Sequence, residues 1–291
     1  MGDDLYAAGR PPTPQPPAVL YHYTRHEAAL RGILSGEMRA TEYVSLNDST
    51  EVSHGLEIFR DLARERFESE PEDTLAWESL KRFLMLYAKL KPTVRGTFLV
   101  ASFSEAKDDL SQWRSYAGNA TGFMIGVRVQ ETPALVAPAP RGQLGLGLFQ
   151  MVYRQARKVR LARGAIDRIL LGAGELAGSA PDDDLCGSAA LALFRCAALA
   201  AQSMKHDTFS SEREWRLTVM GPPDGAGALK TMLRDGGESV RYFPIPLAKE
   251  QIDEVMVGPV ARESAEAEVR ALLPDGLSGL RVTRSRSPYR G

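Results

Sequence analysis

The period of the apolar residues changes along the chain, and this change constrains the fold more than any other sequence feature. Up to residue 90, apolar residues recur at helical spacing, as in the stripe of Leu56, Phe59 and Phe67. From residue 96 onward, short runs rich in β-branched and aromatic residues are typical of strands. Helices early and strands late predict an α+β fold, with a mixed, mainly antiparallel sheet core and flanking helices. The main predicted strands are residues 97–104, 122–129, 240–246 and 252–258.

Several further elements are expected from local signals. A strand over 19–23 precedes a helix that a capping box of Thr24 and Glu27 begins and Gly36 ends. The prolines of 240–246 predict an edge strand. Residues 131–148 are expected to form a loop, 150–153 and 158–161 are interpreted as strand or strand edge, and helices are expected at about 164–175 and 184–204.

Length and composition fit one folded domain. The 291 residues, 44% of them hydrophobic, can bury a full core. We expect a Pro-rich flexible leader over residues 1–17, a single α+β domain over 18–280, and a basic flexible tail over 281–291.

Charge and cysteine usage indicate a cytoplasmic protein. A net charge of -1 gives no global field for steering nucleic acid or for binding an anionic membrane. The helix expected around Cys186 and Cys196 would separate them by roughly 15 Å, too far for a disulfide. We therefore expect buried free thiols in a reducing compartment. The longest apolar run, residues 189–201, is too short to span a bilayer, and no secretory signal is visible.

The segment from Thr208 to Leu217 carries the densest set of candidate site residues. If the run from Glu212 is extended, Glu212, Glu214 and Arg216 share one face, and Trp215 and Leu217 share the other. Carboxylates two residues apart raise each other's pKa unless a cation or ligand lies between them. This arrangement favours a polar site over an apolar support. An edge strand with a solvated charged face is the alternative.

Two more polar groups precede this segment. His22 is expected at a strand end beside a helix N-terminus, where anions commonly bind, although a structural histidine is the alternative. Asp48 and Glu51 fit an N-cap and its N3 partner, and they could also border a site.

A strand and a short helix in the middle of the chain supply the remaining candidates. Ser102 and Ser104 lie on one face of the strand over 97–104. Asp108 or Asp109 is expected to cap the following helix, which carries Gln112, Trp113, Arg114 and Tyr116. Trp and Tyr together with Arg suit a planar or phosphorylated ligand, and an amphipathic helix anchored by its Trp is the alternative.

In this order, the motifs resemble the bacterial family catalogued as domain of unknown function 2971. The matching residues span about 19–260. They are residues 20–24, 46–48, Thr50, Glu51, Phe103, Ser104, 110–116, Lys205, Phe209, Glu212, 214–217 and 257–259.

A looser resemblance is to the ADP-ribosyltransferases. Their order of a His, a Ser-x-Ser and a Glu-x-Glu matches His22, residues 102–104 and residues 212–214. The resemblance implies an ADP-ribosyltransferase-like fold and NAD as substrate, in an NAD-dependent ADP-ribosyltransferase or NAD glycohydrolase of a bacterial toxin or defence system. It also implies that Glu214 holds the ribose and its developing cation, that Glu212 orients or deprotonates an unnamed acceptor, and that His22 binds the adenosine ribose or a phosphate.

NAD or a related nucleotide is thus the expected partner. The expected NAD-binding residues are Tyr23, Thr24, Ser102, Ser104, Gln112, Trp113, Arg114, Tyr116, Lys205 and Arg216. One alternative is a metal-dependent hydrolase or nuclease with His22, Asp48, Glu51 and Glu212 or Glu214 as ligands. Another is a non-enzymatic nucleotide-sensing module that binds through Trp113, Arg114, Tyr116 and Trp215.

Overall fold

The computed structural model describes residues 14–42, 51–90, 98–129, 145–177, 182–220, 229–233, 237 and 239–289. The chain groups into two compact units. Unit 1 comprises residues 1–13, 47–96 and 151–209, and unit 2 comprises residues 14–46, 97–150 and 210–291. That residues 18–280 form a single domain stays a prediction.

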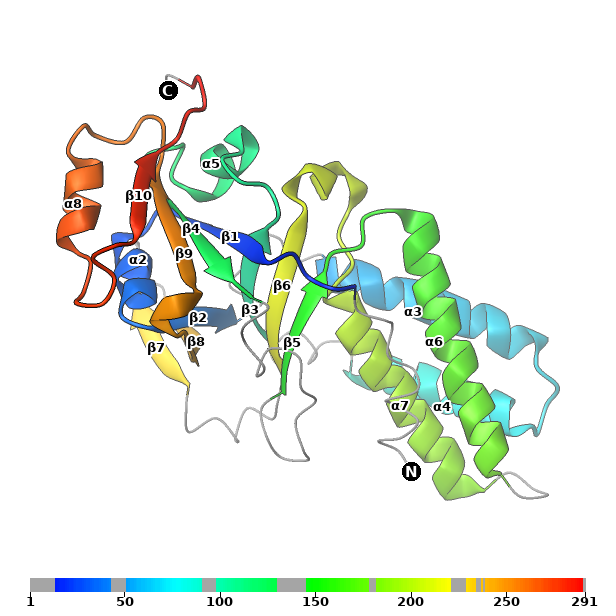
Figure 1. Cartoon of the computed structure of the whole chain (residues 1–291). Helices are drawn as coiled ribbons and strands as arrows, with labels where there is room; N and C mark the ends of the chain where they lie inside the picture. The colour runs from blue at the N-terminus through cyan, green and yellow to red at the C-terminus, as the bar shows by residue number, and fades with distance from the viewer. Residues whose placement is uncertain are drawn as a thin grey trace. The chain divides into compact units, whose positions relative to one another are not determined.

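All strands of the described residues belong to one sheet in unit 2 (Figure 1). They are β1 (Val19–Thr24), β2 (Glu37–Glu42), β3 (Phe98–Ser104), β4 (Phe123–Arg128), β5 (Gly145–Gln150), β6 (Glu214–Met220), β7 (Lys230–Leu233), β8 (Ser239–Pro246), β9 (Ile252–Val257) and β10 (Arg281–Arg284). Eight follow the order β10-β9-β4-β1-β3-β2-β8-β7, while β6 pairs with both β3 and β5. Among the strands of the described residues, β9 and β10 run parallel, and the other pairs are antiparallel. The α+β class with a mixed, mainly antiparallel sheet is confirmed.

The two faces of this sheet are covered differently. Helices α2 (Glu27–Leu34) and α8 (Ala265–Ala271) contribute Leu30 and Val269 to a large apolar cluster with Leu20, Ile125 and Trp215. We call this the core face. On the other face, α5 (Leu110–Tyr116) buries its Trp113 in a smaller cluster. We call this the α5 face.

Several boundaries in unit 2 differ from the sequence predictions. The capping box does not form: His26 is the N-cap of α2 without a side-chain bond, and the Thr24 hydroxyl accepts from the His26 N–H instead. Gly36, with φ of 91°, follows the helix as predicted. Strand β8 is not an edge, because it lies between β2 and β7. Strand β5 begins inside the expected loop, and β10 lies inside the tail that was expected to be frayed.

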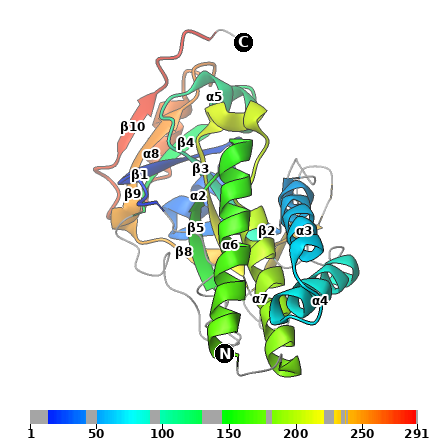
Figure 2. The same ribbon diagram turned by 90° about the vertical axis from the view of Figure 1, so that its right-hand side faces the viewer.

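The long elements of unit 1 in its described residues are α-helices (Figure 2), and Val152 forms an isolated β-bridge with Met204. Its helices are α3 (Glu51–Ser69), α4 (Leu75–Leu90), α6 (Gln155–Leu176) and α7 (Asp183–Ala201). Helix α7 packs against the other three. A Cβ atom on Gly55 would lie 2.6 Å from the Cα of Ala201, so α3 and α7 approach each other closely there.

The expected strand over residues 158–161 is wrong, because these residues lie in α6. The buried residues of α6 include Lys158, Ala162, Ala165 and Ile169, spaced by three or four residues. The alternation of Val159 and Leu161 with basic residues suggested a strand, but the longer helical period decides the structure.

Helix α7 confirms the helix expected at about 184–204, but it is longer than the apolar run that was judged too short to span a bilayer. Asp182 caps it by accepting from the N–H of Asp184. Cys186 and Cys196 are buried free thiols. Among the described helices, α7 alone is long and apolar enough to cross a membrane, but most of its apolar window is buried inside the fold. Such burial is typical of a core helix.

Candidate functional site

Strands β3 and β6 place four of the predicted site residues in two cross-strand pairs. Ser104 lies opposite Glu214, and Ser102 lies opposite Arg216. Directly opposed residues of an antiparallel pair point to the same face. Tyr21 of β1 lies opposite Ser104, so side chains from β1, β3 and β6 lie next to one another on the α5 face.

Glu214 and Arg216 form a buried ion pair on this face. The Nε and Nη2 atoms of Arg216 donate to the two carboxylate oxygens of Glu214 over 2.7 and 3.1 Å. The two residues are only 5% and 3% exposed. Two parallel hydrogen bonds fix the geometry of both groups. Glu214 is therefore a structural anchor of the site and not a free carboxylate.

Glu212 lies outside the strand, which corrects the predicted extended run. It ends a 3-10 helix over Asp207–Glu212, and β6 begins only at Glu214. Between them, Arg213 has a φ of 44°, a left-handed conformation that is uncommon for residues other than Gly. This reversal breaks the alternation of side chains, so strand geometry does not set the direction of Glu212.

Two hydrogen bonds hold Glu212 next to the ion pair. The hydroxyl of Tyr116 donates to its carboxylate over 2.7 Å, and the hydroxyl of Ser104 donates to its backbone carbonyl over 2.6 Å. The Ser104 oxygen in turn accepts from the N–H of Ala106 over 3.0 Å. Glu212 is half-buried, so it is the more accessible of the two carboxylates.

Helix α5 brings Tyr116 and Gln112 to this side. Asp109 caps the helix as predicted, by accepting from the N–H groups of Ser111 and Gln112. Gln112 precedes Tyr116 by one helical turn, so the two share a helix face. Gln112 is 5% exposed, and its Nε2 has no partner among the described residues. A ligand acceptor atom or a water can satisfy such a donor.

We group Glu212, Glu214, Arg216, Ser104, Tyr116 and Gln112 as the β6–α5 cluster. Ser102 lies at its border, opposite Arg216. The cluster combines one accessible carboxylate with a fixed cation, a phenol and two polar side chains. Such a set can bind a polar ligand and stabilise positive charge that develops on it.

His22 is not part of this cluster. Tyr21 points to the α5 face with Ser104 and Glu214, so the neighbouring His22 points to the core face. Its ring lies edge-on to Phe103 at 6.1 Å, and its Nδ1 lies 2.9 Å from the carbonyl oxygen of Ser102. Burial lowers the pKa of His22, and the hydrogen bond to Ser102 opposes this effect. His22 and Glu214, which the resemblance to the ADP-ribosyltransferases assigns to one site, therefore point to opposite faces of the sheet.

Tyr23 and Thr24 have local structural partners. The hydroxyl of Tyr23 donates to the carbonyl of Ala106 over 2.8 Å, and burial raises its pKa. Its ring packs edge-on against Trp113 at 5.1 Å. Thr24 is buried and accepts from the backbone of its own turn.

Two tryptophans of the expected binding face, Trp113 and Trp215, are core residues. Trp113 and Trp215 are 0% and 1% exposed, so they do not form the aromatic binding face expected for a nucleotide-sensing module. The indole N–H of Trp113 donates to Asp108 over 2.8 Å, and that of Trp215 donates to Glu105 over 2.6 Å.

The remaining predicted residues have other partners or lie outside the described residues. The guanidinium of Arg114 stacks over the ring of Tyr289 at 5.7 Å. Lys205 belongs to unit 1, where its Nζ lies 4.9 Å from the ring centre of Phe209. Asp48 and the side chain of Glu51 lie outside the described residues. Within the described parts of the chain, no three His, Cys, Asp or Glu side chains are grouped to hold a metal ion.

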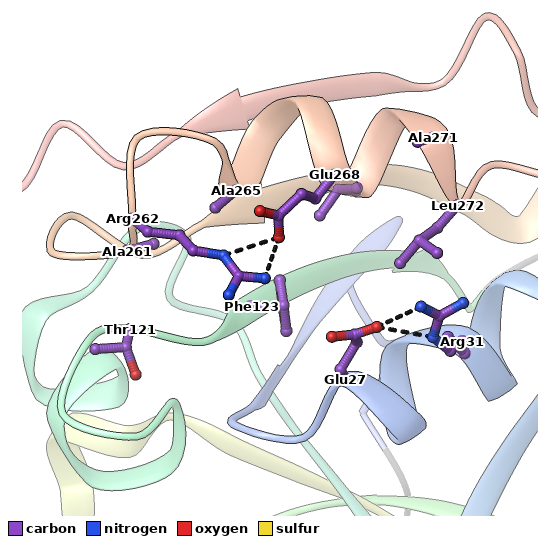
Figure 3. A pocket seen from close by; sticks show the side chains of 11 residues that line it. Glu27, Arg31, Thr121, Phe123, Ala261, Arg262, Ala265, Glu268, Ala271 and Leu272 are labelled. Atoms are coloured by element: carbon purple, nitrogen blue, oxygen red, sulfur yellow. Dashed lines mark hydrogen bonds and ion pairs between the residues drawn. The ribbon is translucent and has the colours of Figure 1, made fainter.

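A pocket of about 600 Å³ lies elsewhere in unit 2, between α2 and α8 (Figure 3). Phe123, Ala265 and Leu272 are among its apolar lining residues, and none of the predicted site residues lines it. Its charged groups are paired: Arg31 with Glu27, and Arg262 with Glu268. We therefore retain the β6–α5 cluster as the candidate site.

Sequence reasoning missed two polar pairs. Glu105 accepts from the indole of Trp215 and from the side-chain amide of Gln150, which lies opposite Trp215 on β5. Lys158 contacts His54 in unit 1. Glu105 directly follows Ser104, and this position could have indicated a residue near the site. Lys158 was missed because it was assigned to a strand and lies in a helix.

Fold and site together define an α+β protein with a carboxylate-bearing polar cluster on one face of an open, mostly antiparallel sheet. Residues 112–217 match the model of a family described as protein of unknown function (DUF2971), which confirms the family resemblance. The match includes most of α5 and ends inside β6, so every member of the cluster except Ser104 lies within it. Neither the curated proteins nor the solved structures contain a match to this chain.

Proposed function

We propose that this chain cleaves the bond between nicotinamide and ribose in NAD, and transfers the ADP-ribosyl group to water or to another acceptor. Glu212 carries the proposal, because it is a half-buried carboxylate with a defined orientation. The order of motifs that resembles the ADP-ribosyltransferases supports the choice of NAD. The buried Glu214–Arg216 pair supports a rigid floor under the reacting group.

The chemistry requires a negative charge beside the ribose. As the bond between the anomeric carbon and the pyridinium nitrogen breaks, the electron pair leaves with nicotinamide, and the sugar gains oxocarbenium character. A positioned carboxylate stabilises this cation in the transition state. In the hydrolytic reaction a water oxygen then bonds to the anomeric carbon and releases a proton, which gives ADP-ribose and nicotinamide.

The proposal gives the two carboxylates different roles from those that the resemblance implies. Glu212 takes the electrostatic role, since Glu214 is engaged by Arg216 on both oxygens. Tyr116 orients Glu212 through its hydroxyl. Ser104 holds the backbone of Glu212, and His22 has no role in this reaction because it lies on the core face.

Incubation of the full chain with NAD, followed by mass spectrometry, tests this function directly. Free nicotinamide and ADP-ribose, or a product carrying ADP-ribose, are expected without added metal. Glu212→Gln should lower the rate by about a hundredfold, the usual effect of removing one electrostatic group. Glu250→Gln is the matched control, because Glu250 is an exposed residue in unit 2 and the substitution removes the same charge. The absence of nicotinamide release from the unmodified chain would refute the proposal.

A further inference from the structure

The pocket between α2 and α8 has no role in the reaction proposed above. It lies on the core face of the sheet, whereas the β6–α5 cluster lies on the α5 face. Its volume of about 600 Å³ is within the range of about 300–1,000 Å³ that is usual for small-molecule sites. Such sites combine a mostly apolar lining with a few polar groups that orient the ligand.

The apolar lining of the pocket comes mainly from one side of α8. Ala265, Val269 and Leu272 are spaced by four and three residues, so they lie along one face of this helix. Phe123, at the start of β4, adds an aromatic ring to the lining (Figure 3). Ala261 and Ala265 have small side chains, which leave room for a ligand. Burying the apolar part of a ligand against this surface is favourable.

The wall that carries Ala261 and Arg262 is held in place by hydrogen bonds. The Nη1 atom of Arg284 donates to the carbonyl of Ala261 over 2.7 Å, and its Nη2 donates to the carbonyl of Arg262 over 2.9 Å. Arg284 belongs to β10, so these bonds fix the loop after β9 to the sheet. A preformed wall lowers the cost of ordering the site when a ligand binds.

Two arginines that line the pocket keep open donors. Arg31 donates from Nε and Nη2 to a single oxygen of Glu27, over 2.8 and 2.5 Å. Arg262 likewise donates from Nε and Nη2 to a single oxygen of Glu268 (Figure 3). The Nη1 atom of each guanidinium has no partner among the described residues. Both arginine side chains are exposed, at 56% and 69%, so these ion pairs are weak and can rearrange at little cost.

The acceptors at the pocket are better satisfied than the donors. Glu268 accepts from Arg262 with one oxygen and from the hydroxyl of Ser264 over 2.7 Å with the other. Within the described part of the chain, Glu27 keeps one carboxylate oxygen without a donor. Most of the open groups are therefore positively charged N–H donors, and these favour an anionic group on the ligand.

We propose that this pocket binds an amphiphilic carboxylate, which is a compact apolar body with one carboxylate group. The apolar body lies against Phe123 and the apolar face of α8, and the carboxylate accepts from Arg262. This arginine is well held, because Arg284 fixes its backbone and Ser264 holds its partner Glu268. Its open Nη1 and Nη2 edge matches the two oxygens of a carboxylate. The site is independent of the proposed NAD chemistry, because it lies on the other face of the sheet.

Isothermal titration calorimetry of the full chain with two pairs of ligands tests this site. Octanoate and 2-naphthoate carry the carboxylate on an acyl chain and on an aromatic ring, and octanamide and 2-naphthamide are their uncharged counterparts. At least one carboxylate should bind with a Kd below about 1 mM, and about tenfold more tightly than its amide. Tighter binding of octanoate would identify an acyl chain as the apolar body, and tighter binding of 2-naphthoate would identify an aromatic ring.

Two variants keep the test decisive. Arg262→Met should weaken binding of the carboxylate by about tenfold and leave binding of the amide unchanged, because it removes the charged donor alone. Arg241→Met is the matched control, since Arg241 is an exposed arginine of the same unit that pairs with Glu42. Ala265→Leu should abolish binding of both ligands by filling the pocket, and if it does not fold, the arginine variants still decide the outcome. Absence of binding by either carboxylate, equal affinity for carboxylate and amide, or unchanged affinity in Arg262→Met would overturn the proposal.

Discussion

Tyr116 donates a hydrogen bond to the carboxylate of Glu212 over 2.7 Å, although the two residues are 96 positions apart in sequence. The bond joins the end of α5 to the turn that precedes β6. This contact therefore brings the motif of α5 and the motif around Glu212 together in one site. Tyr116→Phe should lower nicotinamide release by about tenfold, since a hydrogen bond to a charged group contributes about 1.5 kcal/mol. Steady-state kinetics with NAD measure this loss, and an unchanged rate would show that the bond does not orient Glu212.

Removing one partner of the Glu214–Arg216 pair should destabilise the fold far more than removing both partners together. Both residues are buried, so Arg216→Met removes the guanidinium that faces the Glu214 carboxylate and should cost about 3–5 kcal/mol. The double variant Glu214→Leu with Arg216→Met should recover most of this loss, because no buried charge remains. Urea unfolding measures both values. A double variant that is as unstable as the single one would contradict this account.

His22 should make the fold sensitive to acid. Its pKa is lower in the folded protein than the ordinary value of about 6.5, so the unfolded chain binds more protons below that pH. The contribution of His22 to stability is then complete above about pH 6.5 and is lost as the pH falls toward its folded-state pKa. His54 acts in the same direction.

The free energy of unfolding between about pH 7 and pH 5 measures this dependence. His22→Gln should flatten part of the slope. His206→Gln is the control, because the side chain of His206 is 63% exposed. An identical slope in the His22 variant would refute the assignment.

Sequence reasoning was most successful for β6, where alternation alone decides the outcome. It placed Glu214 and Arg216 on one face, and they form an ion pair there. It placed Trp215 and Leu217 on the other face, and both belong to the large apolar cluster. Alternation could not locate Glu212, because Arg213 has a left-handed backbone and no glycine in the sequence indicates this conformation there.

The position of His22 shows a second limit of sequence patterns. The strand that carries His22 was predicted, but the pattern of β1 does not reveal which residue of β3 lies opposite Tyr21. A shift of one residue in register moves every side chain to the other face. The residue order shared with the ADP-ribosyltransferases therefore could not show whether His22 and Glu214 would meet.

Asp108 lies just before the first residue of α5 and should stabilise this helix. Its carboxylate accepts from the indole N–H of Trp113, the hydroxyl of Ser285 and the N–H of Arg286. Asp108→Ala leaves the buried indole without this acceptor and should cost about 3 kcal/mol. Asp108→Asn should cost only about 1 kcal/mol, since its carbonyl still accepts and Asn tolerates the φ of 52° found there. Equal losses in both variants, measured by urea unfolding, would argue against an acceptor role.

Gly258 should be irreplaceable, because it lies against the turn that follows α5. A Cβ atom there would lie 2.0 Å from the carbonyl oxygen of Ala120, and the N–H of Gly258 donates to Gly122. Gly258→Ala should cost about 3 kcal/mol, because backbone must move to make room. Gly279→Ala should change stability by no more than about 0.5 kcal/mol, since no atom of the described residues lies within 4 Å of its added Cβ. Similar melting temperatures for the two variants would contradict this packing.

The placement of the reacting group on the α5 face is the central claim, and a comparison of Glu212→Gln with His22→Gln tests it most directly. Nicotinamide release from NAD is measured for both variants under conditions in which both are folded. The account predicts a loss of about a hundredfold for Glu212→Gln and a rate within about threefold of the unmodified chain for His22→Gln. Loss of activity in His22→Gln with full activity in Glu212→Gln would contradict the claim.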